Sequence, residues 1–279
     1  MIALFRWGMA VCAAMAALPA AAQDIAGDWI DGERHRVRIF AGAVPDAAPG
    51  TVTAFVEMAM DRGWKTYWKN PGTAGGIPPE FKFDASKNVA KAEVLYPVPT
   101  VMSDKAGDVI GYREWAIFPV RITPADARAP VDLIVTANYG ICEKLCVPAE
   151  TVLSLTIPPG PLPDAGADAA RAYANVPRTG AELKPGDPVG LKVERTADAP
   201  GLIRLMARFP GDAAVAAMFL AVPDGRYLPL PVRGAAEGET IAFDVAFQNP
   251  EDLKALKGAT VTVVMVGEKG QSEDRFVID

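Results

Sequence analysis

Two cysteines, Cys142 and Cys146, are the residues of this sequence best suited to chemistry, and only three residues separate them between two predicted strands. A turn at that spacing brings two thiols close enough for a disulfide. Closing a loop of about five residues restrains the unfolded chain by only about 2 kcal/mol, against roughly 5 kcal/mol for a loop of a hundred. Because a chain of 279 residues gains little from so small a clamp, thiol exchange with a partner explains the pair better. A structural disulfide and a metal site remain the alternatives.

Other cysteine chemistries fit this sequence less well. A thioredoxin carries C-x-x-C beside a βα turn, whereas the spacing here is C-x-x-x-C between strands. A cysteine hydrolase needs an imidazole base, and the single histidine, His35, falls in an alternating arginine-rich stretch typical of a surface strand. Two cysteines and a distant histidine fall short of the four ligands of structural zinc. Lys144 and Glu143 act on a thiol pKa in opposite directions, so no net shift is predicted.

The composition indicates a secreted globular protein. Half of the residues are hydrophobic and 22% are charged, which excludes a disordered chain, and a net charge of −6 argues against nucleic-acid binding. Arg6, the apolar run 7–18 and an A-x-A signal at 20–22 are typical of a signal peptide over residues 1–22, which would remove Cys12. No later segment is long and apolar enough to span a bilayer. We therefore expect a soluble mature protein in the periplasm.

Alternating and β-branched runs, separated by proline and glycine, predict an all-β chain. The predicted strands are 34–40, 51–58, 114–122, 131–139, 151–157, 189–195, 202–209, 215–222, 240–247, 260–266 and 275–278. One short helix is predicted over 164–175, where alanine is dense. The predicted fold is therefore two immunoglobulin-like β-sandwiches joined by a Pro-rich linker with one short helix. The expected domains are 23–160 with the cysteine pair, the linker 161–188, and 189–279.

Short motifs in a fixed order accompany the cysteines in the first predicted domain. They are Gly63-Trp64-Lys65-Thr66-Tyr67-Trp68-Lys69-Asn70-Pro71-Gly72, Gly76-Ile77-Pro78-Pro79, Tyr96-Pro97-Val98-Pro99, Gly111-Tyr112, Phe118-Pro119-Val120, Tyr139-Gly140-Ile141-Cys142 and Cys146-Val147-Pro148. Over about residues 30–160 this set resembles the N-terminal periplasmic domain of the thiol:disulfide interchange protein DsbD, and more closely its ScsB-like relatives. The ordered set is far more specific than the cysteine pair alone.

The resemblance implies a thiol:disulfide oxidoreductase that needs no cofactor. In that family an immunoglobulin-like domain takes electrons from a membrane-embedded partner domain and reduces periplasmic thioredoxin-fold clients, with links to cytochrome c biogenesis and, for ScsB-like relatives, copper tolerance. The family's transmembrane channel and C-terminal thioredoxin domain have no counterpart in this sequence. The chain is therefore expected to be a detached carrier with a separate membrane thiol reductase as electron donor, and the direction of electron flow stays open.

The resemblance also implies roles for individual residues. Cys142 and Cys146 match the family's redox pair, and the second cysteine makes the mixed disulfide. Tyr67 matches an aromatic residue beside the pair. The stretch 108–112, with Ile110, Gly111 and Tyr112, falls where the family has a cap loop that shields the cysteines.

A Cu(I)-binding protein is the second functional interpretation. Met58 and Met60 share one face of a predicted strand, where core packing is the simpler explanation. Thioether and thiolate ligands nevertheless suit Cu(I), so the ligand set would be Cys142, Cys146, Met58 and Met60. A third interpretation is a non-catalytic β-sandwich interaction module with an inert disulfide. The second predicted domain carries no recognisable chemistry and is interpreted as a scaffold or docking module.

Overall fold

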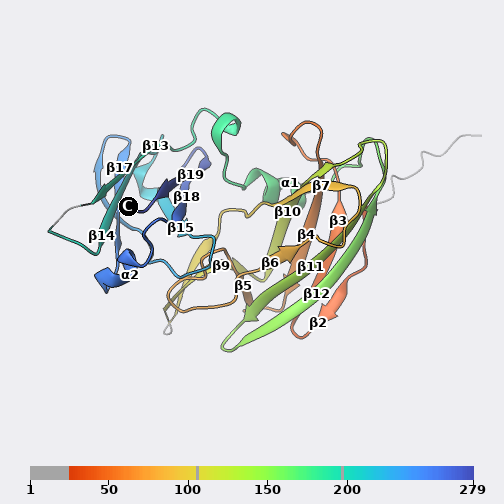
Figure 1. The fold of residues 1–279 in the computed structure, drawn as a ribbon, viewed down its shortest axis with the longest axis horizontal. Helices are drawn as coiled ribbons and strands as arrows, with labels where there is room; N and C mark the ends of the chain where they lie inside the picture. The colour runs from red at the N-terminus through yellow and green to blue at the C-terminus, as the bar shows by residue number, and fades with distance from the viewer. Residues whose placement is uncertain (1–24, 105–106, 196–197) are drawn as a thin grey trace, which may run out of the picture.

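The computed structural model describes residues 25–104, 107–195 and 198–279, so the predicted signal peptide and Cys12 lie outside the described residues. Figure 1 shows two β-sheet units joined by a linker that carries helix α1 (Ala167–Ala174). The predicted all-β fold class is confirmed. No helix within the described ranges is long and apolar enough to cross a membrane.

The first unit is a sandwich of two six-stranded sheets. One sheet has the order β1-β3-β4-β10-β7 with β2 on β3, and the other has β12-β11-β5-β9-β8 with β6 on β11. The strands are β1 (Ile25–Ala26), β2 (Ile30–Gly32), β3 (His35–Ala41), β4 (Val52–Met60), β5 (Lys65–Tyr67), β6 (Glu80–Lys82), β7 (Val89–Val94), β8 (Thr100–Asp104), β9 (Gly107–Arg113), β10 (Trp115–Pro124), β11 (Val131–Cys142) and β12 (Cys146–Ile157).

The core of this sandwich follows from the alternation of apolar residues along its strands. On β11, every second side chain from Val131 to Tyr139 is buried, while those between them are partly exposed. On the facing sheet, Val56 and Phe118 are fully buried in the same cluster. Burial of these faces fixes the register of β11, and with it the position of the cysteine at its end.

The second unit is a smaller sandwich of a four-stranded and a three-stranded sheet. The orders are β13-β14-β17-β16 and β15-β18-β19. The strands are β13 (Val189–Arg195), β14 (Leu202–Arg208), β15 (Ala217–Ala221), β16 (Val232–Glu237), β17 (Thr240–Ala246), β18 (Thr260–Val266) and β19 (Gln271–Val277). A second short helix, α2 (Pro250–Lys254), was not predicted. Asn249 caps it and Pro250 occupies its first position, which together start a helix.

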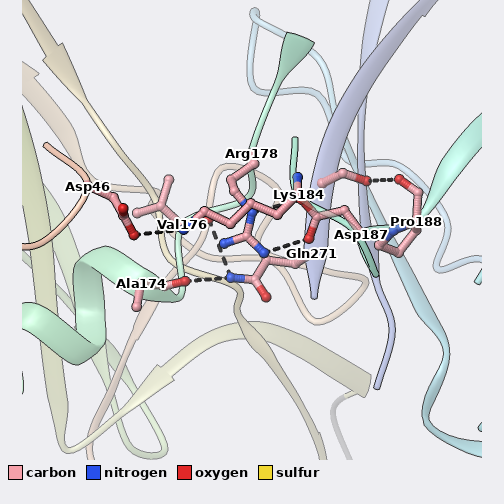
Figure 2. A network of polar contacts seen from close by, with 9 residues as sticks. Asp46, Ala174, Val176, Arg178, Lys184, Asp187, Pro188 and Gln271 are labelled. Carbon is pink, nitrogen blue, oxygen red and sulfur yellow. Dashed lines mark hydrogen bonds and ion pairs between the residues drawn. The ribbon is translucent and has the colours of Figure 1, made fainter. Parts of the chain in front are cut away.

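The linker is fixed to both units by polar contacts (Figure 2). Lys184 forms an ion pair of 2.7 Å with Asp46 of the first unit, and Gln271 of β19 donates to the carbonyl of Ala174 at 2.6 Å. Asp187 accepts hydrogen bonds from Arg178 Nε at 2.8 Å and from the Lys184 N–H at 2.7 Å. Burial alone would raise the pKa of Asp187, but these bonds and the Arg178 charge outweigh it and lower the pKa.

Candidate functional site

The two cysteines close the tip of the β11–β12 hairpin. Cys142 is the last residue of β11 and Cys146 the first of β12, and they face each other across the antiparallel pair with a Cα–Cα distance of 4.3 Å. Their sulfurs form a disulfide, and residues 143–145 make the turn. The long paired strands therefore carry the disulfide at their far end.

The two cysteines have opposite environments. Cys142 is only 2% exposed, whereas Cys146 and the three turn residues are exposed to solvent. Leu145 in the turn is 79% exposed, the largest exposed fraction among the large apolar side chains that the structure describes. An exposed apolar side chain therefore lies directly beside the disulfide.

Tyr67, on β5, has its hydroxyl within hydrogen-bond distance of both sulfurs. The hydroxyl oxygen lies 2.7 Å from Cys142 Sγ and 2.9 Å from Cys146 Sγ, and the side chain is 1% exposed. A phenol can donate a hydrogen bond to sulfur, and the bond is stronger when the acceptor is ionised. When the disulfide is reduced, this hydroxyl can therefore stabilise a thiolate.

A small apolar cap covers the buried side of the disulfide. Met102 of β8, Val109 of β9 and Ala74 of the loop after β5 pack with Tyr67 and Cys142 in one cluster. Met102 and Val109 face each other across the β8–β9 pair. None of these three residues was singled out in the sequence, although Val109 lies within the stretch 108–112 that the resemblance marked as a cap.

The other residues of that stretch lie differently. Gly111 pairs with Tyr67 across β5 and β9, and a Cβ atom on it would lie 2.1 Å from the Thr66 carbonyl oxygen, so the close strand approach requires glycine. Ile110 packs in a separate cluster with Trp68. Tyr112 donates to the carbonyl of Pro97 at 2.7 Å, and burial raises its pKa, which keeps the hydroxyl protonated.

A lysine that no local sequence pattern marks lies at the hairpin. Lys65 pairs with Cys142 across β5 and β11, is 8% exposed, and extends Nζ to within 3.5 Å of the Glu143 carbonyl oxygen. Lys144, the lysine between the cysteines, is exposed in the turn.

The remaining predicted candidates lie away from this cluster. Met58 and Met60 are buried in the main core of the first sandwich, whereas Cys142 packs in a separate cluster. The Cu(I) set of both methionines and both cysteines stays a prediction. His35 shares a hydrogen bond of 2.6 Å with the Tyr139 hydroxyl. Within the described parts of the chain, no group of three or more His, Cys, Asp or Glu residues is arranged to hold a metal ion.

Fold and site together define a class: an immunoglobulin-like β-sandwich with an accessible disulfide at the end of a hairpin. Residues 39–158 match the family model described as Thiol:disulfide interchange protein DsbD, N-terminal, and both cysteines lie within the match. The match covers less than half of the chain and supports a DsbD-like N-terminal domain over these residues, as the resemblance indicated. The match and the Cys142–Cys146 disulfide support thiol:disulfide interchange as the function at the level of the family.

The solved structures that match the chain include a bacterial ScsB domain and a butyrophilin. The N-terminal periplasmic domain of ScsB from Proteus mirabilis has a TM-score of 0.64 and 19% identity, with 92% of this chain and 99% of that chain covered. This likeness shows the fold and extends over both sandwiches. Bovine butyrophilin covers 86% of this chain and 98% of its own at 10% identity, but with a TM-score of 0.21 it supports no argument. No curated protein matches the chain.

Proposed function

We propose that this protein is a periplasmic thiol:disulfide carrier that passes reducing equivalents through the Cys142–Cys146 pair. The observation that carries the proposal is the contrast between an exposed Cys146 and a buried Cys142, joined in a disulfide under the Tyr67 hydroxyl. An inert staple does not require one accessible sulfur, whereas exchange does, because the incoming thiolate must reach it.

The exchange proceeds in two displacements. In the reduced protein, the Cys146 thiolate attacks one sulfur of a client disulfide, so a bond forms between the two proteins and the client's other sulfur leaves as a thiolate. Cys142 then attacks Cys146 Sγ, which re-forms the internal disulfide and releases the second client thiolate. Two electrons pass to the client, whose thiolates take up protons. A donor dithiol reverses the sequence and reduces the carrier again.

The partners follow from the same proposal. A separate membrane thiol reductase supplies electrons, and thioredoxin-fold proteins of the periplasm are the clients. The DsbD-like domain and the fold shared with a periplasmic ScsB domain support this assignment. The exposed turn with Leu145 provides the surface on which either partner docks beside Cys146.

Trapping of mixed disulfides tests the proposal. In Cys142→Ser, Cys146 can form the adduct but no internal thiol resolves it, so a complex with a thioredoxin-fold client or the donor should accumulate on non-reducing gels. In Cys146→Ser, the remaining thiol is buried and the adduct should be weak or absent. If only Cys146→Ser traps a partner, the two roles are reversed. If neither variant traps one, the carrier function is refuted.

A further inference from the structure

The loop that follows Tyr67, residues 68–79, connects the disulfide to the second sandwich. Trp68, the first loop residue, is 1% exposed and packs edge-on against Phe219 of β15, with 6.0 Å between ring centroids. Ile110 of the first sandwich and Ala221 and Val264 of the second are the other buried residues of this cluster. Figure 1 shows β5 and β9 on the side of the first unit that faces β15 and β18. The loop therefore begins at the redox site and continues directly into the interface.

Asn70 holds this loop on the second sandwich. Its amide nitrogen donates to the carbonyl oxygens of Leu220 at 3.0 Å and Leu228 at 3.1 Å, and its side-chain oxygen accepts from the Gly72 N–H at 3.1 Å. The residue is 1% exposed. Both amide hydrogens therefore bind carbonyl oxygens of the second sandwich. Because the site is buried from water, loss of the amide leaves those two carbonyls without a hydrogen-bond donor.

The rest of the loop returns onto the redox site. Gly72 has φ of 91°, and a Cβ atom on it would lie 2.2 Å from the Asp108 carbonyl oxygen, so only glycine fits this approach to β9. Ala74 packs in the cluster with Cys142. Gly76 lies against the Tyr67 ring, where an added Cβ atom would come within 2.2 Å of Cε1. The loop therefore covers the residue whose hydroxyl contacts both sulfurs.

A tyrosine of the second sandwich contacts the same turn of the loop. The Tyr227 hydroxyl lies 3.4 Å from the Gly76 carbonyl oxygen. A Cβ atom on Gly75 would lie 3.6 Å from the same hydroxyl. On the other side, the Ile77 carbonyl accepts from the Gly140 N–H of β11 at 3.0 Å. Loop 68–79 is thus fixed at one end to the second sandwich and at the other to the hairpin strand that ends at Cys142.

We propose that the second sandwich is a positioning module for the redox pair, with Asn70 as the positioning residue. By holding loop 68–79, it keeps the Tyr67 hydroxyl in hydrogen-bond distance of both sulfurs. This inference rests on the proposed carrier function and gives the second sandwich a role in it. A well-placed hydroxyl stabilises the thiolate of the reduced protein, so the interface contributes to the tendency of the pair to stay reduced.

A double-mutant cycle between Asn70→Ala and Tyr67→Phe tests the proposal. Two quantities are measured on the purified protein: the equilibrium constant with a glutathione redox buffer, and the pH midpoint of Cys146 alkylation in the reduced state. The midpoint reports thiolate stability, whereas the plateau rate at high pH reports access. Each single variant should shift the equilibrium toward the disulfide by about three- to tenfold and raise the midpoint, because the thiolate loses a well-placed hydrogen-bond donor. The double variant should have the same equilibrium constant and the same pH midpoint as Tyr67→Phe alone, because coupled changes do not add.

Two further variants make the result specific. Lys184→Gln breaks the 2.7 Å ion pair with Asp46, which joins the linker to the first sandwich and does not involve loop 68–79, and this control should keep wild-type values. Phe219→Leu loosens the Trp68 contact from the second sandwich and should shift both quantities as Asn70→Ala does. If a thermal melt of oxidised Asn70→Ala shows that this variant does not fold, Phe219→Leu replaces it in the comparison with Tyr67→Phe.

The outcomes separate the two proposals. Wild-type values in Asn70→Ala or Phe219→Leu, full additivity with Tyr67→Phe, or an equal shift in Lys184→Gln would each overturn the positioning role. A wild-type pair that does not exchange with glutathione would instead refute the carrier function itself.

Discussion

At the scale of single residues, the two cysteines of the site lie in different environments, one buried and one exposed. Cys142 is enclosed by Met102 and Val109, while Cys146 faces solvent, and Tyr67 contacts both sulfurs. An enclosed thiol next to an accessible one is suited to resolving a mixed disulfide, because it is protected from outside reagents and adjacent to its target.

The cap makes a prediction for Val109. Val109→Ala removes two methyl groups from the cluster around Cys142, so that thiol should react severalfold faster with a small alkylating agent when measured in reduced Cys146→Ser protein. Ile110→Val is the matched control, because Ile110 packs toward Trp68 and not toward the cysteines. Ile110→Val should lower the unfolding free energy by roughly 1 kcal/mol, and Val109→Ala by roughly 2 kcal/mol because it removes one more carbon. An equal rise in reactivity in both variants would contradict the assignment of the cap.

The residues at the site differ in how visible they are in the sequence. The cysteine pair is conspicuous through its spacing, and Tyr67 through the motif around it. Lys65, Met102 and Val109 belong to strands that reach the pair only through sheet pairing, so no local pattern marks them. Alternation along β9 does place Val109 on the face of Gly111, which pairs with Tyr67.

At the scale of elements, the β11–β12 hairpin carries the site and does not depend on its disulfide. The strands pair without interruption from Val131 opposite Ile157 to Cys142 opposite Cys146, and their apolar faces lie in the core. The disulfide closes only the short turn at the tip, which restrains the unfolded chain little.

Reduction of the disulfide should therefore leave the fold intact. We expect the unfolding free energy to fall by no more than about 2 kcal/mol, which corresponds to a decrease in Tm of no more than roughly 8 °C. Thermal melts of oxidised and reduced protein, followed by circular dichroism, measure the difference, with Cys142→Ser/Cys146→Ser as the control for an open pair. Loss of the β-sheet signal on reduction would restore the structural interpretation of the disulfide.

Long, half-buried strands could be predicted from the sequence, whereas short ones could not. The strands at 189–195 and 260–266 were predicted with their observed bounds, because they stand between clear turn residues. β5 has three residues and β9 contains two glycines, so neither shows a usable alternation. β12 begins five residues before its predicted start, since Pro148 interrupts the pattern. As an edge strand, β12 tolerates that proline.

At the scale of the whole molecule, the linker and the interface fix how the two sandwiches meet. The two-sandwich fold could be predicted from strand number and spacing. The contacts between the sandwiches could not, because they use a buried amide, Asn70, and backbone carbonyls whose positions depend on the completed fold.

The linker predicts an acid sensitivity centred on Asp187. Its pKa is lowered in the folded state, so its contribution to stability is complete above the ordinary value of about 3.9 and is lost as the pH falls through the lowered value. Asp187→Asn should be less stable than wild type by about 1–3 kcal/mol at pH 7, since a charged hydrogen-bond acceptor is removed. The difference should shrink below about pH 4.

Urea denaturation at pH 7, 4 and 3 measures that difference. Asp46→Asn is the control, because Asp46 pairs with Lys184 on an exposed surface and should contribute far less. A stability difference for Asp187→Asn that stays constant between pH 7 and pH 3 would show that the carboxylate charge is not what fixes the linker.

The reduction potential of the Cys142–Cys146 pair tests the central claim most directly. It is measured by equilibrating the purified protein in glutathione or dithiothreitol buffers of known potential and counting free thiols by alkylation and mass. A pair that exchanges with thioredoxin-fold partners should have a potential near theirs, between about −270 and −200 mV. A value below about −300 mV, typical of structural disulfides, would contradict the carrier function.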